Sequence, residues 1–170
     1  AMRQIESQLV QEMVKAGCVL IENQQDIQRL VDLTVLPNGT PNKKFVGKNA
    51  SVILDAAHIP YNGDPRLIIM RTPKDHPFAV IEMLMPILPV VTVDSFDEGL
   101  DVCLMLEAGL HHTATMHSLN MERLNRMARK MKTSIFVKNG PSYAGLGFSG
   151  EGTTTFTIAT PTGESTTSAR

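Results

Sequence analysis

The chain has 170 residues, of which 42% are hydrophobic and 19% are charged, so it can bury one sizeable core and is not expected to be disordered. Its formal net charge of -1 gives no electrostatic reason to bind nucleic acid or an anionic membrane. Its longest apolar stretches are interrupted by Glu82 or by prolines, and they are shorter than the roughly 20 residues of a membrane-spanning helix. We therefore expect one soluble domain over residues 1–170, with no nucleic-acid or membrane partner.

The first half of the chain predicts helices that alternate with short buried strands. An apolar helical face recurs at Ile5, Leu9, Met13 and Ala16, and Gly17 follows as a stop signal. Asn23 is expected to cap the next helix. The other expected elements are a strand at 18–21, an exposed loop at 36–42, a helix at 47–58, and strands at 66–70 and 87–93.

The second half of the chain continues the alternation. It predicts a helix at 96–108, a strand at 112–117, a helix at 120–131 and a strand at 133–138. Strands separated by helices favour a parallel sheet with helices on both faces. Residues 139–170 are rich in Gly, Thr and Ser, with one strand-like run at 153–158.

Glu82 is the most informative single residue, because it is the one charged side chain in the otherwise almost entirely apolar run from His76 to Val93. A carboxylate that is buried without a partner costs several kcal/mol or shifts its pKa. Two interpretations stay open on the residues alone. Glu82 either has a structural role, at the end of a helical turn or facing solvent, or it is an unusual buried carboxylate kept for a ligand.

Other motifs give weaker signals of a site. Residues 145–150 match G-x-G-x-x-G, but a β-branched run follows them in place of the helix that would hold a pyrophosphate. No metal site is expected, because His111 and His112 would point to opposite faces of a strand and no suitably spaced carboxylate or thiolate lies nearby. Cys18 and Cys103 lie in apolar segments without an adjacent base, which favours inert buried thiols.

Four segments, in a fixed order, carry a family resemblance. They are HPFAVIEMLMPILPVV, HHTATMHS, TSIFVKNGPSYAGLG and GEGTTTFTIATPTGESTTSAR. They resemble the C-terminal part of the catalytic domain of CoA-acylating aldehyde dehydrogenases, and among these the ethanolamine- and propanediol-utilisation enzymes of bacterial microcompartments. The resemblance implies a three-layer α/β fold with a mostly parallel sheet and helices on both faces. It also implies a Gly/Thr-rich extension toward the oligomerisation region, within an active-site loop and strand at about 139–170.

The resemblance implies a reaction in which a short aldehyde, propanal or acetaldehyde, reacts with coenzyme A and NAD to give an acyl-CoA and NADH through a cysteine thioester. Glu82 and Pro86 match the wider superfamily pattern E-x-F-G-P, whereas its Phe and Gly are replaced. Glu82 is thereby assigned to the hydroxyls of the nicotinamide ribose, with Pro86 in the same cofactor-binding segment. The resemblance further implies an acyl pocket to which His112, Ser142, Tyr143 and Phe148 contribute.

Neither cysteine stands in the N-N-x-P-C-like segment that holds the family's nucleophile. We therefore expect this chain to lack the catalytic cysteine and the NAD domain and to be inactive by itself. The resemblance implies a homo-oligomer, a dimer or tetramer, in the bacterial cytoplasm or inside a microcompartment, where shell or partner enzymes would bind. The alternative hypothesis is a non-catalytic folding or assembly module derived from that family.

Overall fold

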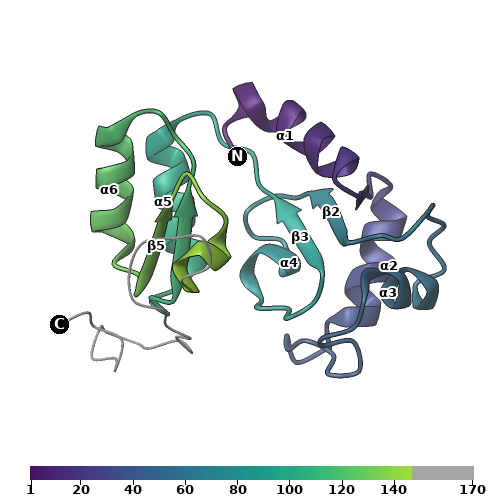
Figure 1. Cartoon of the computed structure of the whole chain (residues 1–170). Coiled ribbons are helices and arrows are strands. Elements are labelled where there is room, and N and C mark those ends of the chain that lie inside the picture. Colours follow the sequence, from purple (N-terminus) through teal and green to yellow (C-terminus); the bar gives the residue numbers. More distant parts are fainter. Residues whose placement is uncertain (147–170) are drawn as a thin grey trace. The chain divides into compact units, whose positions relative to one another are not determined.

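The computed structural model describes residues 1–146 of the chain. These residues belong to two compact units, an N-terminal unit over Ala1–Ser95 and a C-terminal unit that begins at Phe96. Figure 1 labels most of the helices and strands of the two units, which are described separately below. The single domain expected over residues 1–170 stays a prediction, and the strand expected at 153–158 lies outside the described residues.

The N-terminal unit is built on a three-stranded parallel sheet in the order β1-β2-β3. The strands are β1 (Cys18–Leu20), β2 (Leu67–Arg71) and β3 (Ile87–Val90). β2 is central, and its residues Ile68, Ile69 and Met70 have no exposed surface. Such a continuous buried run is typical of a parallel strand covered on both faces.

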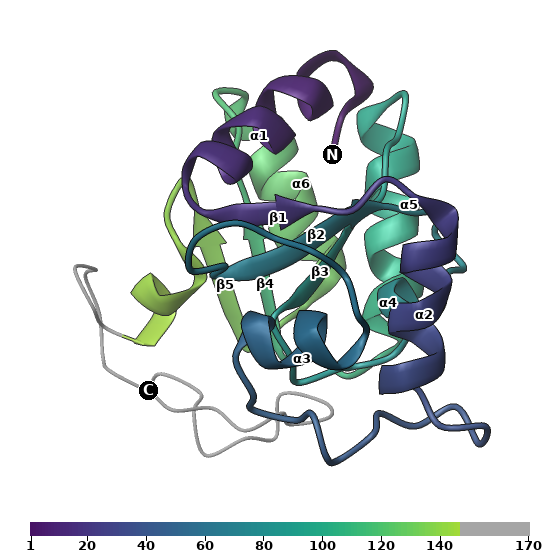
Figure 2. The same ribbon diagram turned by 90° about the vertical axis from the view of Figure 1, so that its right-hand side faces the viewer.

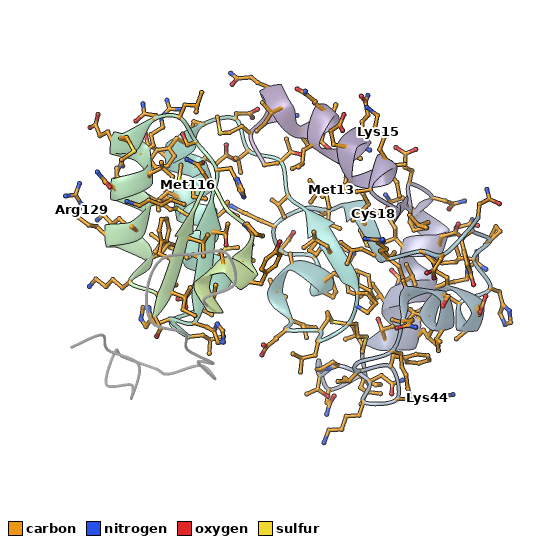
Figure 3. All side chains as sticks on the ribbon, in the orientation of Figure 1. Met13, Lys15, Cys18, Lys44, Met116 and Arg129 are labelled. Carbon is orange, nitrogen blue, oxygen red and sulfur yellow. The ribbon has the colours of Figure 1, made fainter. Side chains whose placement is uncertain are left out.

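Helices cover both faces of this sheet, as Figure 2 shows. On one face α1 (Arg3–Lys15) packs Val10 against Ile69 and Val90, and Met13 and Cys18 belong to the same cluster (Figure 3). The other face carries the larger core, which includes Ile68 and Met70. Its helices are α2 (Gln24–Thr34), α3 (Ala50–Ala56) and α4 (Pro77–Val80). The predicted three-layer, parallel α/β architecture is confirmed.

The local start and stop signals act as the sequence predicts. The side chain of Asn23 accepts a hydrogen bond of 2.8 Å from the backbone N–H of Gln25, which caps α2. Gly17 follows α1 with φ +97°, a conformation that glycine adopts without steric cost. The helix expected at 47–58 begins only at Ala50, because residues 43–47 form turns. The short helix α4 was not predicted.

The apolar face predicted for α1 is buried only in part, since Met13 packs with Val10 against the sheet. Ile5 and Leu9 are 54% and 42% exposed, whereas Glu6 and Val10 are buried. Residues four apart share one face of a helix, so both pairs fit the helical period equally well. The sheet contacts the stripe that includes Val10, because a charge on Arg71 provides a partner for Glu6 there.

The C-terminal unit has a two-stranded parallel sheet, formed by β4 (Thr113–Met116) and β5 (Ile135–Lys138). The helices α5 (Phe96–Glu107) and α6 (Met121–Met131) pack on one face, where Ala114 and Phe136 contact the buried Leu100 and Met127. The short 3-10 helix η1 (Ser142–Leu146) packs along β5 on the other face. Both helices and both strands therefore occur where the sequence predicts them.

Candidate functional site

The loop that holds Glu82 connects α4 to β3. Pro77 is the first residue of α4, and the Nδ1 atom of His76 accepts a hydrogen bond of 3.2 Å from the backbone N–H of Phe78. The Phe78 ring is buried in the core and anchors this short helix. α4 ends at Val80, two residues before Glu82. The His76 cap and the buried Phe78 ring hold this helix in place, so the loop begins at a fixed point.

Glu82 is exposed, so the prediction of an unusual buried carboxylate is wrong. Its neighbour Met83 is 5% exposed and points into the core, whereas Leu84 is 61% exposed. Apolar neighbours in the sequence do not by themselves bury a side chain, because neighbouring side chains in a loop can point in different directions, as those of Glu82 and Met83 do. Within residues 1–146, no ion pair or hydrogen bond occupies the Glu82 carboxylate.

Backbone hydrogen bonds hold the end of this loop. The carbonyl oxygen of Pro86 accepts from the N–H of Ile68 at 2.9 Å, which extends the pairing of β2 and β3. The carbonyl oxygen of Leu84 accepts from the N–H of Gly47 at 3.1 Å. Leu84 has φ +53°, in the left-handed region that branched residues rarely adopt. Pro86 therefore has a structural role through its carbonyl, at the end of the segment that holds Glu82.

A cavity of about 500 Å³ lies beside this loop, entirely within the N-terminal unit. Its walls come from residues 47–50, 64–66 and 84–86. They include the charged side chains of Lys48, Asp64 and Arg66. Glu82 precedes the lining residue Leu84 by two positions in the sequence but does not itself line the cavity.

The C-terminal unit brings two of the other predicted site residues near β4. The hydroxyl groups of Thr115 and Ser142 lie 3.1 Å apart, which connects β4 to η1. The Nδ1 atom of His112 is hydrogen bonded to the hydroxyl group of Thr113, and the His112 carbonyl accepts from the N–H of Ile135 at 3.1 Å. Tyr143 is 57% exposed. Phe148 lies outside the described residues.

Gly145 has a packing role that explains the first glycine of the G-x-G-x-x-G match. A Cβ atom at this position would lie 2.3 Å from Cγ2 of Ile135, well inside contact distance. Only glycine therefore allows η1 to approach β5 this closely. The remainder of the motif lies outside the described residues.

The two cysteines have the properties of inert thiols. Cys18 and Cys103 are both half-buried, and burial raises the pKa of each thiol. A raised pKa lowers the fraction of thiolate at neutral pH, and the thiolate is the nucleophilic form. Residues 1–146 contain no group of three side chains that could hold a metal ion. The Nδ1 atom of His111 lies 3.2 Å from the carbonyl oxygen of Met131.

Sequence reasoning missed the buried carboxylate that the structure does contain. Glu6 is 7% exposed and its Oε1 accepts a hydrogen bond of 2.8 Å from Nε of Arg71. Nη1 of Arg71 also donates to Glu22 at 3.0 Å. The available signal was the spacing of Glu6 and Val10, which places both on one face of α1.

The N-terminal unit is a parallel α/β fold, and the loop between α4 and β3 presents the exposed carboxylate of Glu82. Such a unit can supply one part of a ligand site. No family model matches the chain. It is 53% identical over 167 residues to a propanal dehydrogenase (CoA-propanoylating) of Citrobacter freundii, covering 98% of this chain and 36% of that protein. It is 52% identical over 132 residues to an acetaldehyde dehydrogenase (acetylating) of Salmonella typhimurium, covering 78% of this chain and 28% of that protein.

Solved structures give the same result. A Rhodopseudomonas palustris propionaldehyde dehydrogenase with bound propionyl-CoA has a TM-score of 0.91 at 44% identity, over 96% of this chain and 36% of its own. An engineered glycolyl-CoA reductase with bound NADP+ has a TM-score of 0.91 at 43% identity, over 96% of this chain and 37% of its own. A propionaldehyde dehydrogenase from a Clostridium phytofermentans fucose-utilisation microcompartment has a TM-score of 0.91 at 40% identity, over 96% of this chain and 38% of its own.

Four of these five likenesses cover 96% or more of the chain, at 40% to 53% identity, so the chain is homologous to the CoA-acylating aldehyde dehydrogenases. It spans about a third of the length of the relatives it matches. The resemblance drawn from the four sequence segments is confirmed. None of the helices described between residues 1 and 146 has the length and apolar character of a membrane span.

Proposed function

We propose that this chain supplies part of the catalytic domain of an NAD-dependent, CoA-acylating aldehyde dehydrogenase. The observation that carries the proposal is the 53% identity to a propanal dehydrogenase (CoA-propanoylating) over 98% of the chain. The reaction converts an aldehyde, coenzyme A and NAD to an acyl-CoA, NADH and a proton, by way of a cysteine thioester that coenzyme A resolves. Propanal and acetaldehyde both stay candidate substrates, because relatives of both kinds match.

Glu82 is the proposed cofactor-positioning residue of this chain. NAD accepts the hydride, and a carboxylate can accept hydrogen bonds from two neighbouring ribose hydroxyls and so restrict where the nicotinamide ring lies. The geometry fits this role, since Glu82 is exposed and has no competing ion-pair partner among residues 1–146. The cap from His76 and the buried ring of Phe78 hold α4 in place, so the Glu82 loop begins at a defined point.

The acyl pocket is the second proposed contribution. His112 precedes β4, and Ser142 and Tyr143 begin η1, which the Thr115 hydroxyl contacts through Ser142. Tyr143 is exposed and could supply an apolar wall for a short acyl chain. Phe148 is proposed as a further wall on the resemblance alone.

The catalytic cysteine is proposed to come from sequence that this chain does not include, because neither Cys18 nor Cys103 has an activated thiol. The assembled enzyme is proposed to be a homo-oligomer in the bacterial cytoplasm, within a microcompartment. The relative from a Clostridium microcompartment supports that location.

A chimera tests the proposal. The 167 matching residues of the Citrobacter freundii enzyme are replaced by those of this chain, and NADH formation from propanal is followed with CoA and NAD present. We expect the chimera to be active and this chain by itself to be inactive. Aldehyde- and CoA-dependent NADH formation by the purified chain would contradict the assignment of the cysteine, and an inactive but folded chimera would contradict the proposed function.

The same chimera tests Glu82. Glu82→Gln should slow hydride transfer in a single turnover roughly tenfold to a hundredfold, because the ring is no longer held in a productive position. Binding of the aldehyde should change much less. The matched control is Glu122→Gln, an exposed residue in the first turn of α6. An unchanged single-turnover rate in Glu82→Gln would exclude the role.

A further inference from the structure

One side chain holds the turn that leads from β5 into η1. Asn139 follows the last residue of β5, and its Oδ1 atom accepts a hydrogen bond of 2.7 Å from the backbone N–H of Ser118. Its Nδ2 atom donates to the carbonyl oxygen of Ser118 at 3.0 Å. We propose that Asn139 is a positioning residue, which acts through η1 on the acyl pocket. The inference deepens the proposed function and rests on it, because Ser142 and Tyr143 must contribute to that pocket.

The two hydrogen bonds between Asn139 and Ser118, here called the amide clamp, join the carboxyl ends of two parallel strands. Ser118 comes two positions after Met116, the last residue of β4, and the N–H of Asn139 donates to the carbonyl oxygen of Met116 at 2.9 Å. The side chain of Asn139 therefore continues the pairing of β4 and β5 beyond the strands. Ligands of open α/β sheets bind outside the carboxyl ends of the strands, so the clamp lies at the functional edge.

The chemistry of the clamp requires an amide at position 139. The backbone N–H of Ser118 can only donate and its carbonyl oxygen can only accept, so the partner must offer one acceptor and one donor. A carboxylate of the same shape would place a charged oxygen against the carbonyl oxygen of Ser118. Asn139 also adopts φ +54°, a left-handed conformation that asparagine tolerates better than most residues. Backbone conformation and hydrogen bonding therefore both favour asparagine.

The clamp determines where η1 begins. Two residues separate Asn139 from Ser142, and one of them is a proline, whose ring fixes φ. The hydroxyl groups of Ser142 and Thr115 then lie 3.1 Å apart, and Gly145 lets the end of η1 approach Ile135. Loss of the clamp should let the start of η1 shift, and with it the wall that η1 contributes to the pocket.

Steady-state kinetics of the Citrobacter freundii chimera test the proposal with Asn139→Asp. We expect kcat/KM for propanal to fall about tenfold, because the pocket wall is no longer held in place. The ratio of kcat/KM for propanal to that for acetaldehyde should fall about threefold, since a displaced wall contacts the additional methylene less well. A variant that only destabilised the fold would lower both activities alike and leave this ratio unchanged.

The matched control is Asn125→Asp. Asn125 is an exposed residue of α6 in the same unit, and its Oδ1 atom accepts a hydrogen bond of 2.8 Å from Nζ of Lys138. An aspartate keeps that acceptor, so we expect the control to retain both the activity and the substrate ratio of the unmodified chimera.

Deamidation of the folded chimera tests the clamp without reference to catalysis. Asparagine followed by glycine deamidates when the glycine nitrogen attacks the side-chain amide carbon, ammonia leaves, and water opens the resulting succinimide. Asn139 precedes Gly140, and Asn62 precedes Gly63. The side chain of Asn62 is exposed and has no hydrogen-bond partner within residues 1–146. Peptide mass spectrometry should show deamidation about tenfold slower at Asn139, because its two hydrogen bonds must first break.

Three results would overturn the proposal. Equal deamidation rates at Asn139 and Asn62 would show that the clamp does not form. An unchanged substrate ratio in Asn139→Asp, or the same change in Asn125→Asp, would show that the clamp does not act on the pocket. These results concern Asn139 alone, because they are obtained with an active chimera. A folded but inactive unmodified chimera would instead contradict the proposed function, and the inference would fail with it.

Discussion

Glu6 in α1 and Glu82 in the loop before β3 lie in opposite environments within the same unit. Glu6 is 7% exposed and paired with Arg71, whereas Glu82 is exposed with no ion-pair partner among the described residues. The surrounding sequence suggests the reverse, because Glu82 stands in an apolar run and Glu6 stands in a polar helix. A buried, paired carboxylate contributes to folding, whereas an exposed one is available to a ligand.

Removing the partner of Glu6 should have the largest effect on stability. Arg71→Met leaves a carboxylate buried without its main counter-charge, and we expect the free energy of unfolding to fall by roughly 2 kcal/mol. Complete loss of a buried partner costs about 3–5 kcal/mol, and the smaller figure allows for the side chain of Arg71 being 40% exposed to water. Urea denaturation provides the measurement.

The control for Arg71→Met is Lys15→Met, which breaks the exposed pair with Glu12 and should barely move the urea midpoint. Equal midpoints for the two variants would show that the Glu6 and Arg71 pair is no more important than a surface ion pair.

Neutralising Glu6 should have a smaller effect. Glu6→Gln keeps the shape of the side chain and an oxygen that can accept from Arg71, and Arg71 keeps its contact with Glu22. We expect a loss of about 1 kcal/mol, the difference between a charge-assisted and a neutral hydrogen bond. The same urea titration measures it, and a stabilised variant would mean that burial of the charge outweighs its pairing.

The same substitution at Glu82 sharpens the comparison. Glu82→Gln should change the free energy of unfolding by less than about 0.5 kcal/mol, as is usual for an exposed side chain without partners. A loss as large as that of Glu6→Gln would reveal a structural role for Glu82 and weaken its assignment to a cofactor.

The smallest expected effect is a pH dependence at the start of the Glu82 loop. Burial lowers the pKa of His76 from its ordinary value of about 6.5, and the nearby Asp75 only partly opposes this. The neutral ring caps α4 by accepting from Phe78. Because the folded pKa is the lower one, the unfolded form binds more protons, and stability should fall as the pH drops below about 6.5.

Amide hydrogen exchange at Phe78 measures this opening. The exchange rate, corrected for its intrinsic pH dependence, should rise toward acid pH in the wild type. His76→Asn keeps a capping acceptor that does not titrate, so its corrected rate should stay flat. A parallel rise in the variant would exclude His76 as the cause.

Periodicity and capping residues were sufficient for most of the fold. Asn23, Gly17 and the helical periodicity predicted the long helices, because capping and periodicity depend on neighbours in the sequence. The parallel pairing was predicted from the order of the elements, because strands separated by helices favour parallel neighbours. The four-residue helix α4 was missed, since its stability comes from a proline, a histidine cap and one buried ring rather than from a periodic pattern.

The candidate site was predicted only in part. Four ordered segments were enough to recognise the family, and they placed Glu82 and Pro86 in one loop. The exposure of Glu82, the cavity beside it and the strained conformation of Leu84 depend on which segments of the chain meet in space. Residues 47–50 and 64–66 are distant from this loop in sequence, so no local pattern connects them to it.

The sequence by itself therefore determined the class of fold, the position of most elements and the family, because local hydrogen bonding and ordered motifs are properties of neighbouring residues. Only the tertiary structure decided which carboxylate is buried. α1 can present either of two stripes to the sheet, and the position of Arg71 at the end of β2 favours the stripe that carries Glu6. Burial is a property of the contacts a side chain makes, and those contacts come from residues far away in the chain.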